Sequence, residues 1–94
     1  MRVSELLDRP EKWTQRAMAR DRGDWPIDFN DTGAVCWCLM GAMSFCHEGC
    51  GFISSYEKVF KIVTKRGYDS VTKWNDAKER TWGDVKALAL EAEI

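Results

Sequence analysis

The chain has 94 residues, 45% of them hydrophobic, and five are tryptophan. That composition excludes an intrinsically disordered chain, and the length suits one domain over residues 1–94 rather than two independent cores. The formal net charge is −1, from 14 basic and 15 acidic residues. No overall field therefore attracts nucleic acid, and a nucleic-acid partner is not expected.

No segment has the apolar run of a signal peptide, or of a membrane span, which takes roughly 18 consecutive apolar residues. The sequence therefore predicts a cytoplasmic protein without membrane association. In that compartment the four cysteines are expected to stay reduced rather than to form disulfides.

The first third of the chain predicts short helical pieces followed by a hairpin. A helix is predicted over residues 5–9, and a further helical turn over residues 10–15. Two extended pieces on either side of a glycine-containing turn predict a β-hairpin over residues 17–29. Pro26 would place the second strand of this hairpin at a sheet edge. A continuous helix over residues 11–20 is the alternative.

The middle of the chain predicts a central helix over residues 32–47, where apolar side chains recur at i, i+3 and i+4 spacing. Gly41 within it costs roughly 1 kcal/mol of helix propensity, and a small residue there indicates that another backbone passes close by. Three more helices are predicted at 54–65, 70–76 and 81–92. We therefore expect a mainly α fold of α+β type, with four to five short helices around a buried central helix and a small N-terminal β-hairpin.

Several phrases of the sequence occur together in one known family. They are Trp13-Thr14-Gln15, Ala17-x-Ala19-Arg20-Asp21, Cys38-Leu39-Met40-Gly41-Ala42, and Trp74-Asn75-Asp76-Ala77 with Arg80-Thr81. Over most of its length the chain resembles a family of small uncharacterised proteins of actinobacteria, proteobacteria and their phages, described as a domain of unknown function. Many members have glycine where this chain has Arg16. The resemblance implies no activity, and it implies a regular cysteine only at Cys38.

All four cysteines and the single histidine fall between positions 36 and 50. The candidate metal ligands are therefore Cys36, Cys38, Cys46, His47 and Cys50. Zinc needs four such donors in a tetrahedron, whereas a helix over residues 32–47 would point Cys36 and Cys38 in nearly opposite directions. The same helix would separate Cys38 from His47 by about 13 Å, too far for a nucleophile and its base. Buried, inert thiols are favoured, with no metal or cofactor; a zinc-stabilised interaction module is the alternative.

The predicted site consists of polar side chains and a tryptophan from two distant regions of the chain. Its residues are Gln15, Arg20, Asp21, Trp74, Asn75, Asp76 and Arg80. Such a set fits a ligand site with an arginine clamp, as in a small enzyme or ligand sensor. It also fits a buried network that fixes how the elements dock, which is the favoured interpretation. Trp25 and Trp37 are predicted to be partly exposed and to contact a partner.

A basic helix face is interpreted as a solvated surface; it consists of Lys58, Lys61, Lys65 and Arg66. The sequence has no phosphate-binding loop, nucleophile elbow or metalloprotease motif. The leading hypothesis is therefore a non-enzymatic protein that binds another macromolecule, with a protein as the expected partner. Because the resembling family occurs in phages, the specific form we expect is an accessory inhibitor of a host defence complex, anti-CRISPR-like, in the host cytoplasm.

Overall fold

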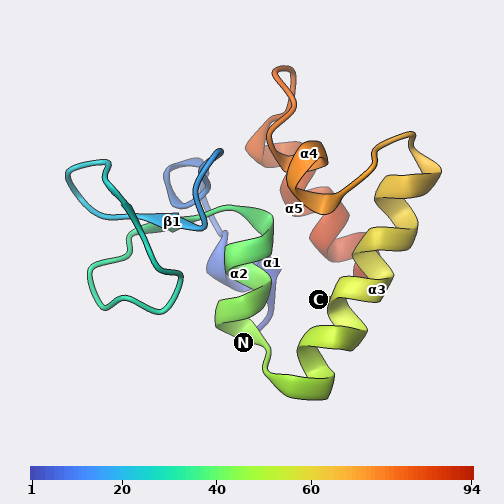
Figure 1. Ribbon diagram of the computed structural model, residues 1–94, viewed down its shortest axis with the longest axis horizontal. Helices are drawn as coiled ribbons and strands as arrows, with labels where there is room; N and C mark the ends of the chain where they lie inside the picture. The colour runs from blue at the N-terminus through green and yellow to red at the C-terminus, as the bar shows by residue number, and fades with distance from the viewer.

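The computed structural model describes all of residues 1–94 (Figure 1). Five α-helices and one 3₁₀ turn combine with a three-stranded antiparallel sheet. In chain order the elements are α1 (Val3–Leu6), the turn η1 (Pro10–Lys12), β1 (Ala19–Arg20), β2 (Pro26–Ile27), β3 (Cys36–Trp37), α2 (Leu39–Cys46), α3 (Gly49–Lys65), α4 (Val71–Asn75) and α5 (Trp82–Ala92). The predicted mainly α fold of α+β type is confirmed.

The elements are arranged around α2. Figure 1 shows the small sheet and its loops at one end of the molecule, α3, α4 and α5 at the other, and α2 between them. Helix α2 packs against α1, α3 and α4, so the predicted central position of this helix is confirmed. No helix in the structure combines the length and the apolar character that a membrane crossing demands.

The sheet is built around β1, which pairs with β2 on one side and with β3 on the other. Ala19 lies opposite Trp37 of β3 in this register. The hairpin predicted over residues 17–29 is confirmed, and the alternative helix over residues 11–20 is wrong, because the backbone of β1 bonds to two neighbouring strands. Pro26, which has no amide hydrogen, lies in the edge strand β2 as predicted.

The central helix is shorter than the predicted range of residues 32–47. Cys36–Trp37 forms the third strand of the sheet instead of the first turn of a helix. The Cys38 amide donates to the Met18 carbonyl at 3.2 Å, so the chain stays extended until α2 begins at Leu39. A short apolar run before a helix has no periodicity of its own, and pairing with a distant strand decides its conformation.

Gly41 lies where α2 approaches the chain that leads into β1. A Cβ atom on this residue would overlap the carbonyl oxygen of Met18. The Gly41 amide donates to the sulfur of Cys38 at 3.2 Å, which makes Cys38 the N-cap of α2. The predicted close approach of another backbone at this glycine is confirmed.

Helices α4 and α5 lie within the ranges predicted for them, and each begins at a hydroxyl cap. The Ser70 side chain accepts from the Lys73 amide at 3.0 Å. The Thr81 side chain accepts from the Asp84 amide at 3.2 Å, and the Asp84 carboxylate accepts from the Thr81 amide in return. Local hydrogen bonds of this kind are readable from sequence because donor and acceptor are three residues apart.

Two other helices begin earlier than the sequence predicts. Helix α1 spans Val3–Leu6 instead of residues 5–9, and α3 begins at Gly49 instead of residue 54. The glycines at the start of α3 lie in its first turn, where the amides have no helical partner in any case, so they do not prevent the helix from starting there.

The hydrophobic core is a single cluster of 17 buried side chains, drawn from all five helices and from the sheet. Trp74 is its largest fully buried side chain and is 1% exposed. Ile94, 2% exposed, also belongs to it, and its carbonyl accepts from the Val3 amide at 2.7 Å. The two ends of the chain are therefore held together beside the core.

Candidate functional site

Asn75 is the centre of the predicted polar cluster and is 1% exposed. Its Oδ1 accepts from the ring nitrogen of Trp13 at 2.8 Å and from the Leu39 amide at 3.0 Å. Its Nδ2 donates to the Thr14 carbonyl at 3.2 Å and to the Asp76 carboxylate at 2.9 Å. Two acceptor and two donor positions complete the capacity of an asparagine amide, so Asn75 keeps none for a ligand.

Gln15 and Asp76 belong to the same network. The amide nitrogen of Gln15 donates to the carbonyls of Asn75 and Ala77 at 2.8 and 3.0 Å. The Asp76 carboxylate accepts from the Arg16 amide at 2.9 Å. These bonds attach the segment before β1 to the C-terminal end of α4, and they support the network interpretation over a ligand site.

Arg16 occupies an unusual place beside this network. Its φ of 64° lies in the left-handed region, which favours glycine. Next to it is a recess of about 240 Å³, with Cys38, Thr72 and Asp76 on its wall. That volume is below the range of about 300–1,000 Å³ typical of small-molecule pockets.

Arg20 connects the network to the hairpin. Its Nε donates to the Thr14 hydroxyl at 3.0 Å, and its Nη2 donates to the Gln15 carbonyl at 3.1 Å. Its Nη1 donates to the Asp24 carbonyl at 3.0 Å, on the far side of the hairpin turn. Arg20 therefore clamps the turn to the same segment that Asn75 holds.

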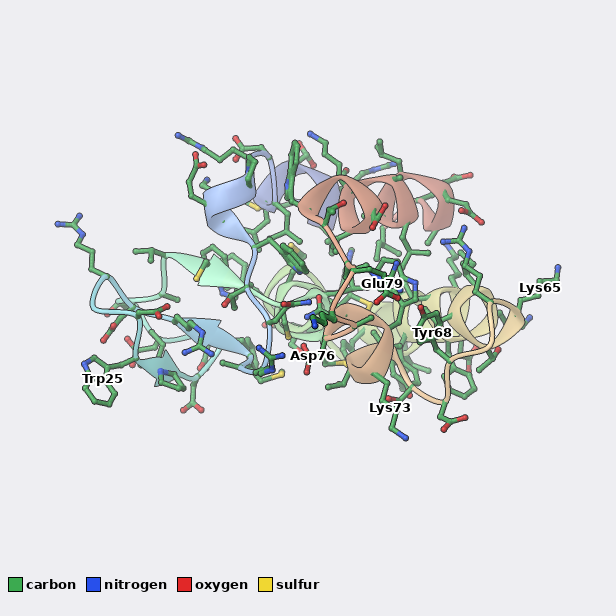
Figure 2. All side chains as sticks on the ribbon, turned by 90° about the horizontal axis from the view of Figure 1, so that it is seen from above. Trp25, Lys65, Tyr68, Lys73, Asp76 and Glu79 are labelled. Carbon is green, nitrogen blue, oxygen red and sulfur yellow. The ribbon has the colours of Figure 1, made fainter.

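Asp21 organises the turn between β1 and β2. Its carboxylate accepts from the amides of Gly23 and Trp25 at 2.9 and 3.0 Å. Its own amide donates to the Trp25 carbonyl at 3.0 Å, which closes the loop. Trp25 is 70% exposed, so its predicted exposure is confirmed. Figure 2 shows Trp25 at the end of the molecule opposite Lys65.

The other tryptophans of the predicted site are buried. Trp37 is 7% exposed, so the prediction that it is partly exposed is wrong. Its place on β3 turns it into the core, where its ring nitrogen donates to the Phe29 carbonyl at 2.8 Å. Trp74 lies under Arg80, whose guanidinium carbon is 4.0 Å from the ring centroid.

Arg80 is enclosed rather than available as a clamp. Its side chain is 10% exposed, its Nε donates to the Trp74 carbonyl at 2.8 Å, and its Nη1 lies 3.6 Å from the Asp84 carboxylate. Its Nη2 is buried without a hydrogen-bond partner. The guanidinium lies over the rings of Trp74 and Tyr68, and the cation–π attraction offsets part of the cost of the missing hydrogen bond.

The structure does not bring the five candidate metal ligands together. No group of three or more His, Cys, Asp or Glu side chains is placed to hold a metal ion. Cys36 lies on β3 rather than on a helix. The ring nitrogen Nε2 of His47 forms a hydrogen bond with the Ile94 carbonyl at 3.1 Å.

Two of the four free thiols, Cys36 and Cys38, are buried, and that of Cys46 is half-buried. Burial raises the pKa of Cys36 and of Cys38, and it raises the pKa of Cys46 to about 11. These side chains are therefore neutral thiols near pH 7 and poor nucleophiles. Cys50 alone is exposed.

The predicted site thus divides into three parts. Gln15, Asn75 and Asp76 form one network, Arg20 and Asp21 carry it into the hairpin turn, and Trp74 with Arg80 forms a separate stack. Sequence reasoning missed the backbone of Thr14 and the ring of Trp13 as members of the network. The sequence signal for both residues is the Trp13-Thr14-Gln15 phrase, in which they directly precede the predicted site residue Gln15. Neither residue is a typical catalytic or metal-binding group, so the phrase alone does not indicate their role.

The fold and this network define a small, mainly α domain of α+β type, in which the polar residues of the sequence motifs bond to one another. The chain belongs to the Family of unknown function (DUF6197), whose model matches residues 1–93. This membership confirms the resemblance drawn from the motifs. No match is found among curated proteins or among solved structures.

Proposed function

We propose that the protein works without chemistry of its own, by binding another macromolecule through its hairpin end. The observation that carries this proposal is Trp25, 70% exposed on a turn that is closed by its own hydrogen bonds. Exposed tryptophans are common energetic centres of protein interfaces. A rigid turn also reduces the entropy lost when an interface forms.

The hydrogen-bond network around Asn75 supports the proposal because it fixes the position of the turn that carries Trp25. Asn75 holds the segment of Thr14 and Gln15, that segment holds Arg20, and Arg20 holds the Asp24 carbonyl. The polar motif residues then act as a scaffold that presents Trp25, and their internal bonding agrees with a binding protein better than with an enzyme or a ligand sensor.

The surroundings of Trp25 favour a partner with basic and apolar groups. A shallow hollow of about 470 Å³ lies beside the turn and is lined by Ala17, Met18, Pro26, Ile27, Asp28 and Asp31. Met18 and Pro26 are exposed apolar residues, and the two aspartates give the rim a negative charge. Charge of this kind directs association toward a positively charged surface.

In its specific form, the proposal makes the protein a phage or mobile-element accessory that inhibits a host defence complex, anti-CRISPR-like, in the host cytoplasm. The occurrence of the resembling family in phages supports this form by analogy. The partner is then a subunit of that complex, and the hairpin end occupies a surface that the complex needs for its own substrate.

The experiment compares the wild-type protein with Trp25→Ala in affinity capture from host lysate and in a phage plating assay on cells with the defence system. We expect the wild type to hold one partner in stoichiometric amount and to restore plating. Truncation of an interface tryptophan costs about 2 kcal/mol or more of binding free energy, which corresponds to about 30-fold weaker binding. Trp25→Ala is therefore expected to fail in both assays.

Leu90→Ala is the matched control, because Leu90 is 57% exposed and lies on α5, away from the hairpin. Both variants are expected to keep the wild-type free energy of unfolding within about 0.5 kcal/mol, since each removes a surface side chain. Equal capture by the wild type and Trp25→Ala, or no stoichiometric partner for either, would reject the proposal.

A further inference from the structure

A second charged surface lies at the other end of the molecule, along the C-terminal half of α3. Lys58, Lys61 and Lys65 recur at i, i+3 and i+7, so they share one face of the helix. None of these three lysines takes part in an ion pair, although seven ion pairs occur elsewhere in the chain. This face therefore carries cationic charge that forms no ion pair within the protein.

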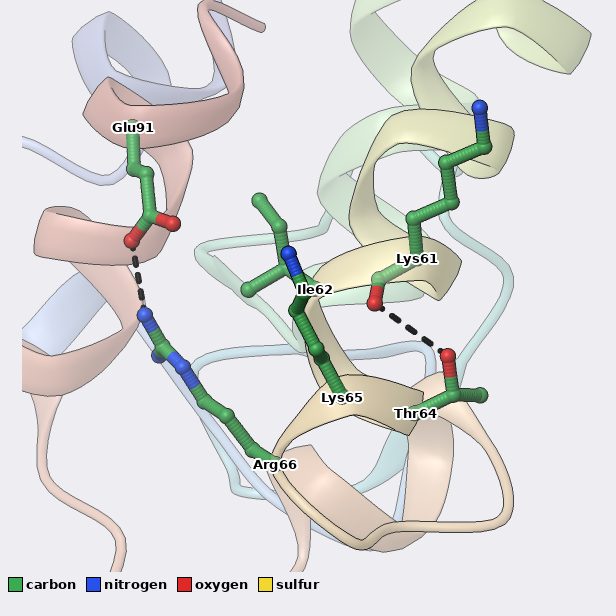
Figure 3. A pocket seen from close by; sticks show the side chains of 6 residues that line it. All are labelled: Lys61, Ile62, Thr64, Lys65, Arg66 and Glu91. Carbon is green, nitrogen blue, oxygen red and sulfur yellow. Dashed lines mark hydrogen bonds and ion pairs between the residues drawn. The ribbon is translucent and has the colours of Figure 1, made fainter.

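The basic face borders a groove between α3 and α5, shown in Figure 3. The groove has a volume of about 580 Å³ and is lined by Lys61, Ile62, Thr64, Lys65, Arg66 and Glu91. This volume falls in the range of about 300–1,000 Å³ in which pockets hold ligand groups. The Thr64 hydroxyl bonds to the carbonyls of Phe60 and Lys61 at 2.8 and 3.2 Å, so it is already engaged by the helix.

One carboxylate already occupies the edge of the groove. Arg66 Nη2 donates to Glu91 Oε1 at 2.7 Å across the gap between the two helices. Both side chains are about half exposed, with 45% and 52% of their surface accessible. An arginine and a carboxylate at this distance form a charge-assisted bond, and exposure to water leaves it open to exchange with another carboxylate.

We propose that this groove binds an acidic segment of a partner protein, at a site separate from the hairpin end. Carboxylates of the segment contact Lys61 and Lys65, and one of them competes with Glu91 for Arg66. An apolar side chain of the same segment packs on Ile62. Figure 2 shows Lys65 and Trp25 at opposite ends of the molecule, so the two surfaces can be occupied at the same time.

A protein segment fits the groove better than a nucleic acid does. A continuous phosphate backbone carries a charge on every nucleotide and meets Glu91 in the wall, whereas a segment with apolar residues between its carboxylates can place an uncharged residue there. None of the six lining residues is aromatic, so the groove lacks the stacking platforms that single-stranded nucleic acids use.

The test measures the fluorescence anisotropy of a fluorescein-labelled peptide of glutamate and leucine titrated with the full chain at an ionic strength of about 0.1 M. The double variant Lys61→Gln/Lys65→Gln removes two cations from the groove. Two exposed ion pairs of ordinary strength correspond to about fivefold in affinity, so we expect binding at least that much weaker. Glu91→Gln frees Arg66 and is expected to tighten binding about twofold or more.

The control is Lys73→Gln/Lys78→Gln, which changes the net charge equally but lies on α4 and in the loop after it, outside the groove. It is expected to change the affinity by less than about twofold, because exposed charges act weakly beyond a Debye length of about 10 Å. Equal weakening by both double variants would mean a net-charge effect and would overturn the proposal. A single-stranded DNA oligonucleotide of equal charge that binds more tightly than the peptide would also overturn it.

Two further measurements separate this site from its alternatives. If the acidic hairpin end of a second copy fills the groove, the wild type will self-associate at low ionic strength in analytical ultracentrifugation and the groove variant will not, a result that excludes a separate partner. Trp25→Ala is expected to bind the peptide like the wild type, so failure of the hairpin proposal and failure of the groove proposal give different results.

Discussion

Arg16 is one of three residues other than glycine that have a positive φ, with Asp24 and Glu93. Its φ of 64° lies in the left-handed region, where a residue with a β-carbon is strained. The side chain of Arg16 is exposed. The network uses only its amide, which donates to Asp76 at 2.9 Å. Arg16→Gly keeps that amide and removes the strain, so we expect about 1 kcal/mol more stability in urea unfolding followed by tryptophan fluorescence.

Arg22→Gly provides the comparison for this change. Arg22 is also an exposed arginine in a loop, but its φ is not positive. Glycine there only increases the entropy of the unfolded chain, so this variant is expected to lose up to about 1 kcal/mol. A loss of stability in Arg16→Gly of similar size would show that the arginine side chain makes a compensating contact.

The cysteines allow a second test at the scale of single residues. Cys50 is exposed, whereas burial raises the pKa of Cys36 and Cys38, and raises that of Cys46 to about 11. Since only the thiolate reacts, we expect one fast-reacting thiol per chain toward a maleimide at pH 7, and none in Cys50→Ser. Labelling of Cys46 is expected to accelerate as the pH rises toward about 11.

Intact mass spectrometry after timed quenching counts the modified thiols. Any fast-reacting thiol in Cys50→Ser at pH 7 would contradict the protection of Cys36, Cys38 and Cys46. It would also reopen the thiol chemistry that the sequence analysis disfavoured for Cys38 and His47.

At the scale of elements, the sequence predicts well where hydrogen bonds are local. The capping residues Ser70 and Thr81 define the starts of α4 and α5 because their partners are three residues away. The start of α2 could not be predicted in this way. Strand β3 exists because the Cys38 amide and Met18 carbonyl meet across twenty residues of chain, a contact that local periodicity does not contain.

The junction between α2 and the sheet depends on Gly41, and Gly41→Ala tests it. On propensity alone alanine would stabilise a helix by about 1 kcal/mol. Here the new β-carbon overlaps the Met18 carbonyl oxygen, and relief of the overlap breaks the bond from the Cys38 amide. We expect a net loss of about 3 kcal/mol in the free energy of unfolding, measured in urea.

Gly83→Ala is the matched control, because Gly83 also lies near the start of a helix. Its β-carbon would meet only the Thr81 hydroxyl at 3.7 Å, an ordinary van der Waals contact. This variant is expected to be unchanged or more stable by up to about 1 kcal/mol. If Gly41→Ala behaved in the same way, the close approach of α2 to the sheet would be wrong.

At the scale of the whole molecule, the membership of the polar site was predictable but its connections were not. Polar residues beside tryptophans identify Gln15 and Asn75 as special, and the motif resemblance marks the same positions. Which of their atoms meet depends on bonds that span about sixty residues, such as that from the Trp13 ring to Asn75. The burial of Trp37 escaped prediction for the same reason, because it follows from the strand that the sequence did not reveal.

Asn75 joins three parts of the molecule, so its removal tests the integrity of the whole fold. It bonds to Trp13 and Thr14 before the sheet, to Leu39 at the start of α2, and it lies itself at the end of α4. Asn75→Ala leaves the buried Leu39 amide and the partly buried Trp13 ring nitrogen without an acceptor. Each such loss costs about 1–3 kcal/mol, so we expect a total of about 3 kcal/mol or more in urea unfolding.

The same variant also tests the link between the network and the hairpin. Hydrogen exchange is expected to show faster exchange at the Trp25 amide as well as at the Leu39 amide, because Arg20 loses its fixed partners on the Thr14 segment. Asn30→Ala is the control, since Asn30 is exposed and its side chain makes no hydrogen bond within the protein, and it is expected to exchange like the wild type. Faster exchange at Leu39 with an unchanged Trp25 amide would separate the network from the hairpin turn, and the polar motif residues would then stabilise the core without presenting the tryptophan.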